Sequence, residues 1–117
     1  MAADRAKRIA ELNDRLRAAL GMCCGVPGMV VTTRGIADLE ECTKLRVFQA
    51  VRNFQDFSED NDPYGEHDFG KLEIEGVGKV FWKIDYFADV ECMMGSADPA
   101  DTNQSYRVLT IMLAWEY

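Results

Sequence analysis

The spacing of hydrophobic residues predicts two helices. Residues 4–20 carry apolar side chains three and four positions apart, which places them on one helical face. These residues are Ile9, Leu12, Leu16 and Leu20. We expect the arginines and acids between them to face water. A second helix is predicted over about residues 39–54, with an apolar face made of Leu45, Phe48 and Val51.

Four segments have the pattern of β-strands. Residues 29–33 are short and β-branched, and residues 71–75 alternate between apolar and charged side chains. A tight glycine-containing connection at 76–78 joins the latter to 79–87, so we expect a hairpin. Residues 106–117 carry apolar side chains on both faces, which is typical of a central strand buried on both sides.

The order α-β-α-β-β-β predicts an α+β fold. We expect one domain over residues 1–117, because a chain of this length has room for one hydrophobic core. The predicted architecture has two layers: a mainly antiparallel four-stranded sheet with two helices packed on one face.

The charge of the chain is concentrated in one place. The net charge is −7, and residues 56–75, hereafter the acidic segment, hold eight acids against one base, Lys71. The remaining 97 residues hold twelve acids and twelve bases. A chain without a basic surface is a poor candidate for direct nucleic-acid binding, which depends on phosphate neutralisation.

The N-terminal residues and the cysteines indicate a cytoplasmic protein. The charged N-terminal residues lack the apolar run of a secretory signal, and no apolar run is long enough to cross a membrane. Two adjacent cysteines and two isolated ones fit neither a zinc pair nor a recognised disulfide framework. We therefore expect reduced and mostly buried thiols at Cys23, Cys24, Cys42 and Cys92.

The acidic segment also contains the only histidine, His67. With Glu66 and Asp68 beside it, His67 could act as the acid/base of a small hydrolase or nucleotide-handling enzyme, with Lys83 and Arg107 binding an anion. Such an enzyme could be metal-assisted. An open cleft in which His67 faces Asp85 or Lys83 would favour this hypothesis. The alternative is a structural histidine that caps a turn or donates to a loop carbonyl. A buried ring with both nitrogens bonded to backbone groups would favour this alternative.

A cation site is a further candidate in this segment. Read as an EF-hand that starts at Asp60, the loop has oxygen ligands at several required positions and Gly65 at the sixth. Lys71 occupies the twelfth position, where a bidentate glutamate is required, so the EF-hand motif fails. A looser Ca²⁺ or Mg²⁺ site stays open, but we favour a solvated acidic loop and predict no metal and no cofactor.

The favoured hypothesis is a binding module without enzymatic activity. Segregated negative charge beside aromatic residues is typical of a surface that docks onto a basic protein. The predicted partner-binding residues are Asp60, Asp62, Tyr64, Glu66 and Asp68. We expect a monomer or a homodimer, since a free sheet edge can pair with a second copy.

Five strings of residues resemble a small bacterial family, domain of unknown function 3768. They are RIAELNDRLR (8–17), NDPYGEHDFG (61–70), FWKIDYF (81–87), SADPAD (96–101) and RVLTIMLAWEY (107–117). The family has no established activity, so the resemblance implies no catalytic residues. Its members resemble accessory proteins encoded on plasmids and other mobile elements. This implies an anti-restriction or other anti-defence role, in which an acidic surface imitates the charge of nucleic acid.

Overall fold

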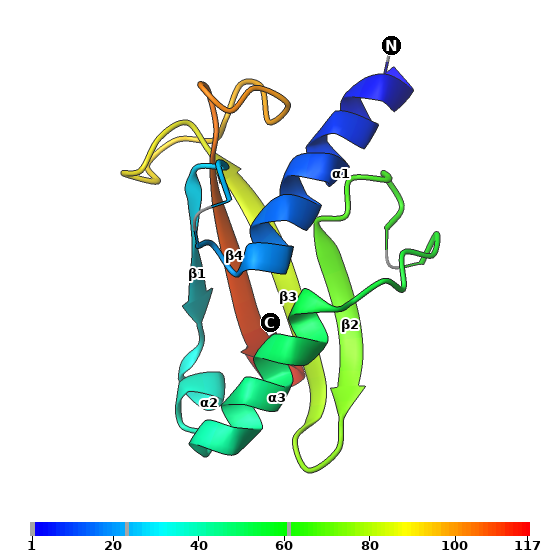
Figure 1. Cartoon of the computed structure of the whole chain (residues 1–117), viewed down its shortest axis with the longest axis vertical. Helices are drawn as coiled ribbons and strands as arrows, with labels where there is room; N and C mark the ends of the chain where they lie inside the picture. The colour runs from blue at the N-terminus through cyan, green and yellow to red at the C-terminus, as the bar shows by residue number, and fades with distance from the viewer. Residues whose placement is uncertain (1, 23, 61) are drawn as a thin grey trace.

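The computed structural model describes residues 2–22, 24–60 and 62–117. Its elements are α1 (Ala2–Ala19), β1 (Gly28–Thr32), α2 (Arg34–Ala37), α3 (Glu41–Arg52), β2 (Phe69–Ile74), β3 (Gly78–Phe87), β4 (Tyr106–Leu113) and the 3-10 helix η1 (Ala114–Glu116). The strands form one sheet in the order β1-β4-β3-β2. The helices α1 and α3 lie on the same face of this sheet (Figure 1). The α+β prediction is confirmed.

Pairing within the sheet is mixed. The β2–β3 and β3–β4 pairs are antiparallel, whereas β1 runs parallel to β4. The sheet is therefore mainly antiparallel, as predicted. The short helix α2 was not predicted, because its four residues span about one turn and show no periodicity.

The strand β4 is central and buried on both sides, as predicted. Leu109 and Ile111 have no exposed surface on one face, and Val108 and Met112 are at most 8% exposed on the other. The predicted strand over 106–117 is too long, because it ends at Leu113 and the chain turns into η1.

One carboxylate, that of Glu116, holds the turn at the end of β4. Its oxygens accept hydrogen bonds from the Leu113 backbone N–H at 3.0 Å, the Gly35 N–H at 2.9 Å and the Thr33 hydroxyl. These bonds connect the end of β4 to the start of α2. Because their donors are far apart in the sequence, the local pattern could not predict where the strand ends.

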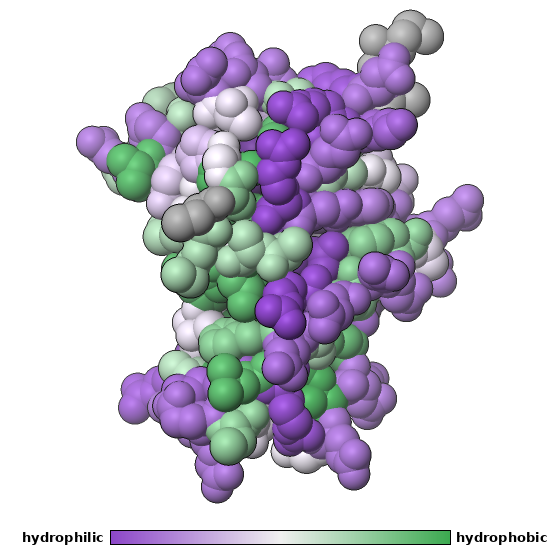
Figure 2. Space-filling view, viewed as in Figure 1, coloured by the Kyte–Doolittle hydropathy of each residue, from purple (hydrophilic) through white to green (hydrophobic). Residues whose placement is uncertain are grey.

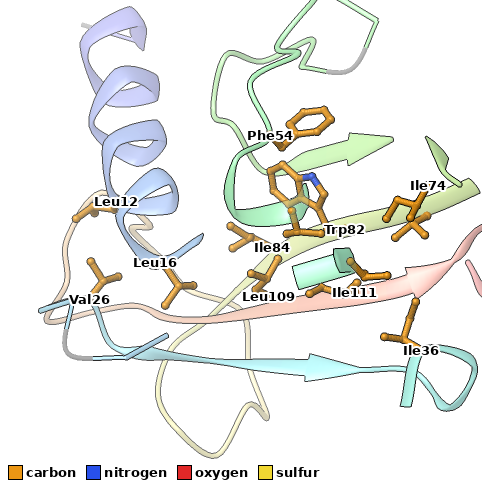
Figure 3. Packing of buried hydrophobic residues seen from close by; sticks show 13 residues of the cluster. Leu12, Leu16, Val26, Ile36, Phe54, Ile74, Trp82, Ile84, Leu109 and Ile111 are labelled. Carbon is orange, nitrogen blue, oxygen red and sulfur yellow. The ribbon is translucent and has the colours of Figure 1, made fainter. Parts of the chain in front are cut away.

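The core lies between the sheet and the two longer helices. Leu12 and Leu16 of α1 belong to the same core cluster as Leu109 of β4, and Phe54 meets the indole ring of Trp82 edge-on (Figure 3). The α3 prediction is wrong for Leu45, which is 58% exposed. The buried stripe of α3 instead runs through Val47 and Val51, and a residue two positions from Val47 points to the opposite side of a helix.

Two polar residues of α1 are buried, contrary to the prediction that its arginines face water. Asn13 is fully buried and Arg17 is 4% exposed. The outer surface of α1 is mainly hydrophilic, whereas hydrophobic residues gather over β1 (Figure 2). Met29 of β1 and Met22, which precedes this strand, are exposed.

The cysteines only partly match the prediction. Cys24 and Cys92 are half-buried free thiols, while Cys42 is exposed. Cys23 lies outside the described residues. Within the described part of the chain, no helix has the length and apolar character needed to cross a membrane.

Candidate functional site

His67 lies at the end of the loop that connects α3 to β2, in a left-handed backbone conformation with φ 55°. Histidine adopts this conformation more readily than most side chains do. The imidazole ring stacks on Phe57, with ring centres 3.7 Å apart and planes 6° from parallel. The ring is therefore fixed by packing on one of its faces.

A carboxylate lies near each of the two nitrogen atoms of this ring. Nδ1 lies 2.9 Å and 3.0 Å from the two carboxylate oxygens of Asp14, and Nε2 lies 3.6 Å from Oδ2 of Asp62. The His67 backbone N–H also donates to Oδ1 of Asp62 at 3.0 Å. Because an ionised carboxylate can only accept, the Nδ1 atom must carry the proton that it shares with Asp14. The ring thus connects the loop to α1.

This arrangement differs from both outcomes considered for His67. The ring nitrogens contact carboxylates rather than backbone groups, and Lys83 lines a different depression of the surface. His67 borders a shallow depression along α1, lined by Ala10, Asp14 and Tyr64 among others. With its two nitrogens directed at carboxylates, the ring is placed to join segments of the protein.

Glu66 and Arg107 belong to a second, partly buried network. The Tyr86 hydroxyl donates to Oε1 of Glu66 at 3.0 Å, and Nδ2 of Asn13 donates to the Glu66 carbonyl at 2.9 Å. Nε of Arg107 donates to Oδ1 of Asn13 at 2.6 Å. Burial raises the pKa of Tyr86, so that its hydroxyl remains a donor.

Arg107 is poorly placed for the predicted role of anion binder. It has no exposed surface, and its guanidinium donates to Asn13, to Ser105 and to the Pro99 carbonyl. Burial lowers the pKa of this guanidinium, but arginine remains charged in proteins. The cation therefore stabilises the packing of α1 against β4 and is not open to solvent.

Asp68 lies apart from its two predicted catalytic partners. It lines a depression together with Lys83 and Asp85, whereas Glu66 and His67 contact residues of α1. Burial raises the pKa of Asp68, and the negative charge of Glu66 raises it further. The structure therefore does not bring Glu66, His67 and Asp68 together as one catalytic set.

The depression that contains Asp68 lies on the sheet face without helices. Phe81, Lys83 and Asp85 alternate along β3 with buried residues that pack under the helices, so they point to the opposite face. We call this depression the sheet-face hollow, and its volume is ≈ 470 Å³. It is lined by Asp60, Pro63, Tyr64, Asp68, Phe69, Lys71, Phe81, Lys83, Ile84, Asp85 and Tyr117.

The structure divides the predicted partner-binding residues into two groups. Asp62 is buried and Glu66 is half-buried, and both contact groups of the protein itself. Asp60 and Tyr64 are exposed and line the sheet-face hollow with Asp68. The outward-facing acids of the segment also include Asp56, Glu59, Glu73 and Glu75.

Three residues of α1 that the sequence prediction missed connect this helix to the rest of the protein. Asn13 contacts Arg107, Asp14 contacts His67, and Arg17 donates to the carbonyl groups of Val51 and Phe54. The sequence spacing indicates that two of them are buried, because Asn13 and Arg17 follow Ile9 at intervals of four and therefore share its helical face. Over the described ranges, no cluster of three or more His, Cys, Asp or Glu side chains is arranged to hold a metal ion.

The fold, the sheet-face hollow and the depression beside His67 define a small α+β protein with an acidic loop. A family model described as "Protein of unknown function (DUF3768)" matches residues 32–116, and the chain belongs to this family. The match includes the acidic segment and the strands β2 to β4, while α1 lies outside it. No curated protein and no solved structure matches the chain.

Proposed function

We propose that the protein is an acidic binding module that docks onto a basic surface of a partner protein. The observation that carries the proposal is the exposure of the acidic segment: five of its eight acids are exposed, and one base accompanies them. Such a surface attracts positively charged partners over distances near the Debye length, about 8 Å at physiological ionic strength. It also repels the phosphates of nucleic acid.

The geometry of His67 supports binding over catalysis. A general acid or base needs a nitrogen free to reach a substrate. In this protein Nδ1 is bonded to Asp14, and Nε2 faces the buried Asp62. A cytoplasmic accessory protein from a mobile element that inhibits a DNA-binding defence protein would need such an acidic surface, and we include this role in the proposal.

The surface can be tested with a basic probe of defined composition. We suggest fluorescence anisotropy with a labelled nona-arginine peptide, at several salt concentrations, using a variant with four exposed acids neutralised. The changes are Glu59→Gln, Asp60→Asn, Glu73→Gln and Glu75→Gln. We expect the Kd for the probe to rise by about tenfold or more, because each removed charge weakens a complementary contact.

A matched control has the same net charge with the changes placed elsewhere. Asp4→Asn, Asp38→Asn, Glu40→Gln and Glu91→Gln are exposed outside the acidic segment, and both variants change the net charge from −7 to −3. We expect the control to bind nearly as well as the wild type, and a duplex DNA probe not to bind. Equal weakening in both variants, or binding that does not depend on salt, would refute the proposal.

A further inference from the structure

The sheet-face hollow combines aromatic and acidic side chains in one depression. Phe69, Phe81 and Tyr117 form a cluster in which each ring meets the next edge-on, with centroids 5.6–5.9 Å apart. Tyr117 and the neighbouring Tyr64 are 74% and 77% exposed. Exposed aromatic side chains beside carboxylates are the usual surroundings of a bound organic cation.

The ammonium group of Lys71 lies beside the aromatic rings of the hollow. Nζ of Lys71 lies 6.0 Å from the ring centres of both Phe69 and Phe81. This distance is at the limit of a cation–π contact, so the ring pair is accessible to a positive charge but is only weakly occupied.

The carboxylates of the hollow are unequally neutralised. Lys83 pairs with Asp85 at 3.0 Å. Among residues 2–22, 24–60 and 62–117, neither Asp60 nor Asp68 forms an ion pair. The raised pKa of Asp68 has the same origin, because its charge is partly buried without a compensating cation.

We propose that the sheet-face hollow binds an arginine side chain of the partner, with the guanidinium near Asp68 and Asp60 and against the ring of Tyr64. A guanidinium suits this site better than an ammonium, because it is planar, stacks on aromatic rings and can donate two parallel hydrogen bonds to one carboxylate. This inference rests on the proposed function and assigns its central contact.

The arginine preference can be tested with short blocked peptides. We suggest titrating ¹⁵N-labelled protein with acetyl-Gly-Arg-Gly-amide and with its lysine and citrulline counterparts. Citrulline keeps the shape of arginine but lacks the charge. The expected Kd for the arginine peptide is on the order of millimolar, as befits one side chain. The affected amides should include those of Phe69, Lys83 and Tyr117, with weaker shifts for lysine and none for citrulline.

Two variants locate the contact. Asp68→Asn and Tyr64→Ala should each weaken binding of the arginine peptide at least fivefold, while Asp38→Asn, outside the hollow, should leave it unchanged. Thermal melts will show that each variant is folded. Lys71→Gln removes the competing cation and should tighten binding.

The outcomes separate this inference from the proposed function. Equal shifts for arginine and citrulline, shifts spread over the whole acidic segment, or full binding by Asp68→Asn would refute the arginine site. In that case the proposed function would still stand if the variant with four neutralised acids lost nona-arginine binding and its matched control did not. Retention of nona-arginine binding by both of those variants would refute both proposals.

Discussion

Replacing Arg17 by alanine should destabilise the protein far more than a surface substitution on the same helix. Nη1 of Arg17 donates to the carbonyl groups of Val51, Arg52 and Phe54, at 2.9, 3.1 and 2.9 Å. These carbonyls lie at and just after the end of α3, where the last carbonyl groups of a helix lack the regular intrahelical donors. Arg17 therefore caps one helix from another.

The expected loss of unfolding free energy in Arg17→Ala follows from these contacts. The bonds to Val51 and Phe54 are buried. The Val51 carbonyl keeps the Phe54 backbone N–H as a second donor, whereas the Phe54 carbonyl would lose the donor supplied by Arg17, which destabilises the fold by about 1–3 kcal/mol. The guanidinium also lies 5.0 Å from the ring centre of Trp82, and this contact would be lost. The three charge-assisted hydrogen bonds and the cation–π contact are lost together, and removal of a buried charge recovers part of this loss. We therefore expect Arg17→Ala to reduce the free energy of unfolding by about 3–5 kcal/mol.

Urea denaturation followed by circular dichroism measures this difference. With a slope of about 1–3 kcal/mol per molar urea, the midpoint should fall by at least about 1 M. Arg15→Ala is the matched control, because Arg15 is an exposed arginine of the same helix, and it should change stability by less than about 0.5 kcal/mol. A difference of less than about 1 kcal/mol between the two variants would refute the assigned role of Arg17.

Three further substitutions test other contacts. Asp68→Asn should raise the melting temperature at pH 7, because the pKa of Asp68 is raised by burial and its charged form opposes folding. The higher melting temperature of Asp68→Asn should return to that of the wild type below pH 3.8, the ordinary carboxyl pKa, because the wild-type side chain is then also neutral. Glu116→Gln should lower the melting temperature at pH 7, because the hydrogen bond from Thr33 lowers the pKa of Glu116. The difference in melting temperature between Glu116→Gln and the wild type should vanish as the pH falls below 4.5 and through that lowered pKa. A difference that stays constant with pH would count against this account. Gly70→Ala would place a methyl group 2.2 Å from Nε1 of Trp82. Thermal melts should therefore show that the free energy of unfolding falls by about 3 kcal/mol or more. A melting temperature equal to that of the wild type would show that the strand can shift to accept the methyl group.

The parts of the fold that the sequence predicted depend on local patterns. Val80, Trp82 and Ile84 alternate along the predicted strand 79–87 and therefore share one face, because a strand repeats every two residues whatever it pairs with. The structure buries all three. In the same way, the apolar residues on both faces of 106–117 predicted a central strand. The parallel pairing of β1 with β4 has no such local signal.

The candidate site depends on contacts that no spacing reveals. His67 is 53 residues from Asp14, and Arg107 is 94 residues from Asn13. Both pairs form only after α1 has packed against the sheet. The acidic segment could therefore be found from its charge, but its division into buried and exposed acids could not.

The central position of β4 has a consequence for synthesis of the chain. Its neighbours β1 and β3 both precede it in the sequence, so neither has its β4 partner until the ribosome has made the chain as far as Leu113. During that interval both strands present unpaired backbone groups, which favour association with other chains. The β2–β3 hairpin can pair earlier, but completion of the sheet must be a late event that joins distant segments together. The vulnerable period begins with the synthesis of β1, includes β3 from its own synthesis onward, and ends when β4 has been made.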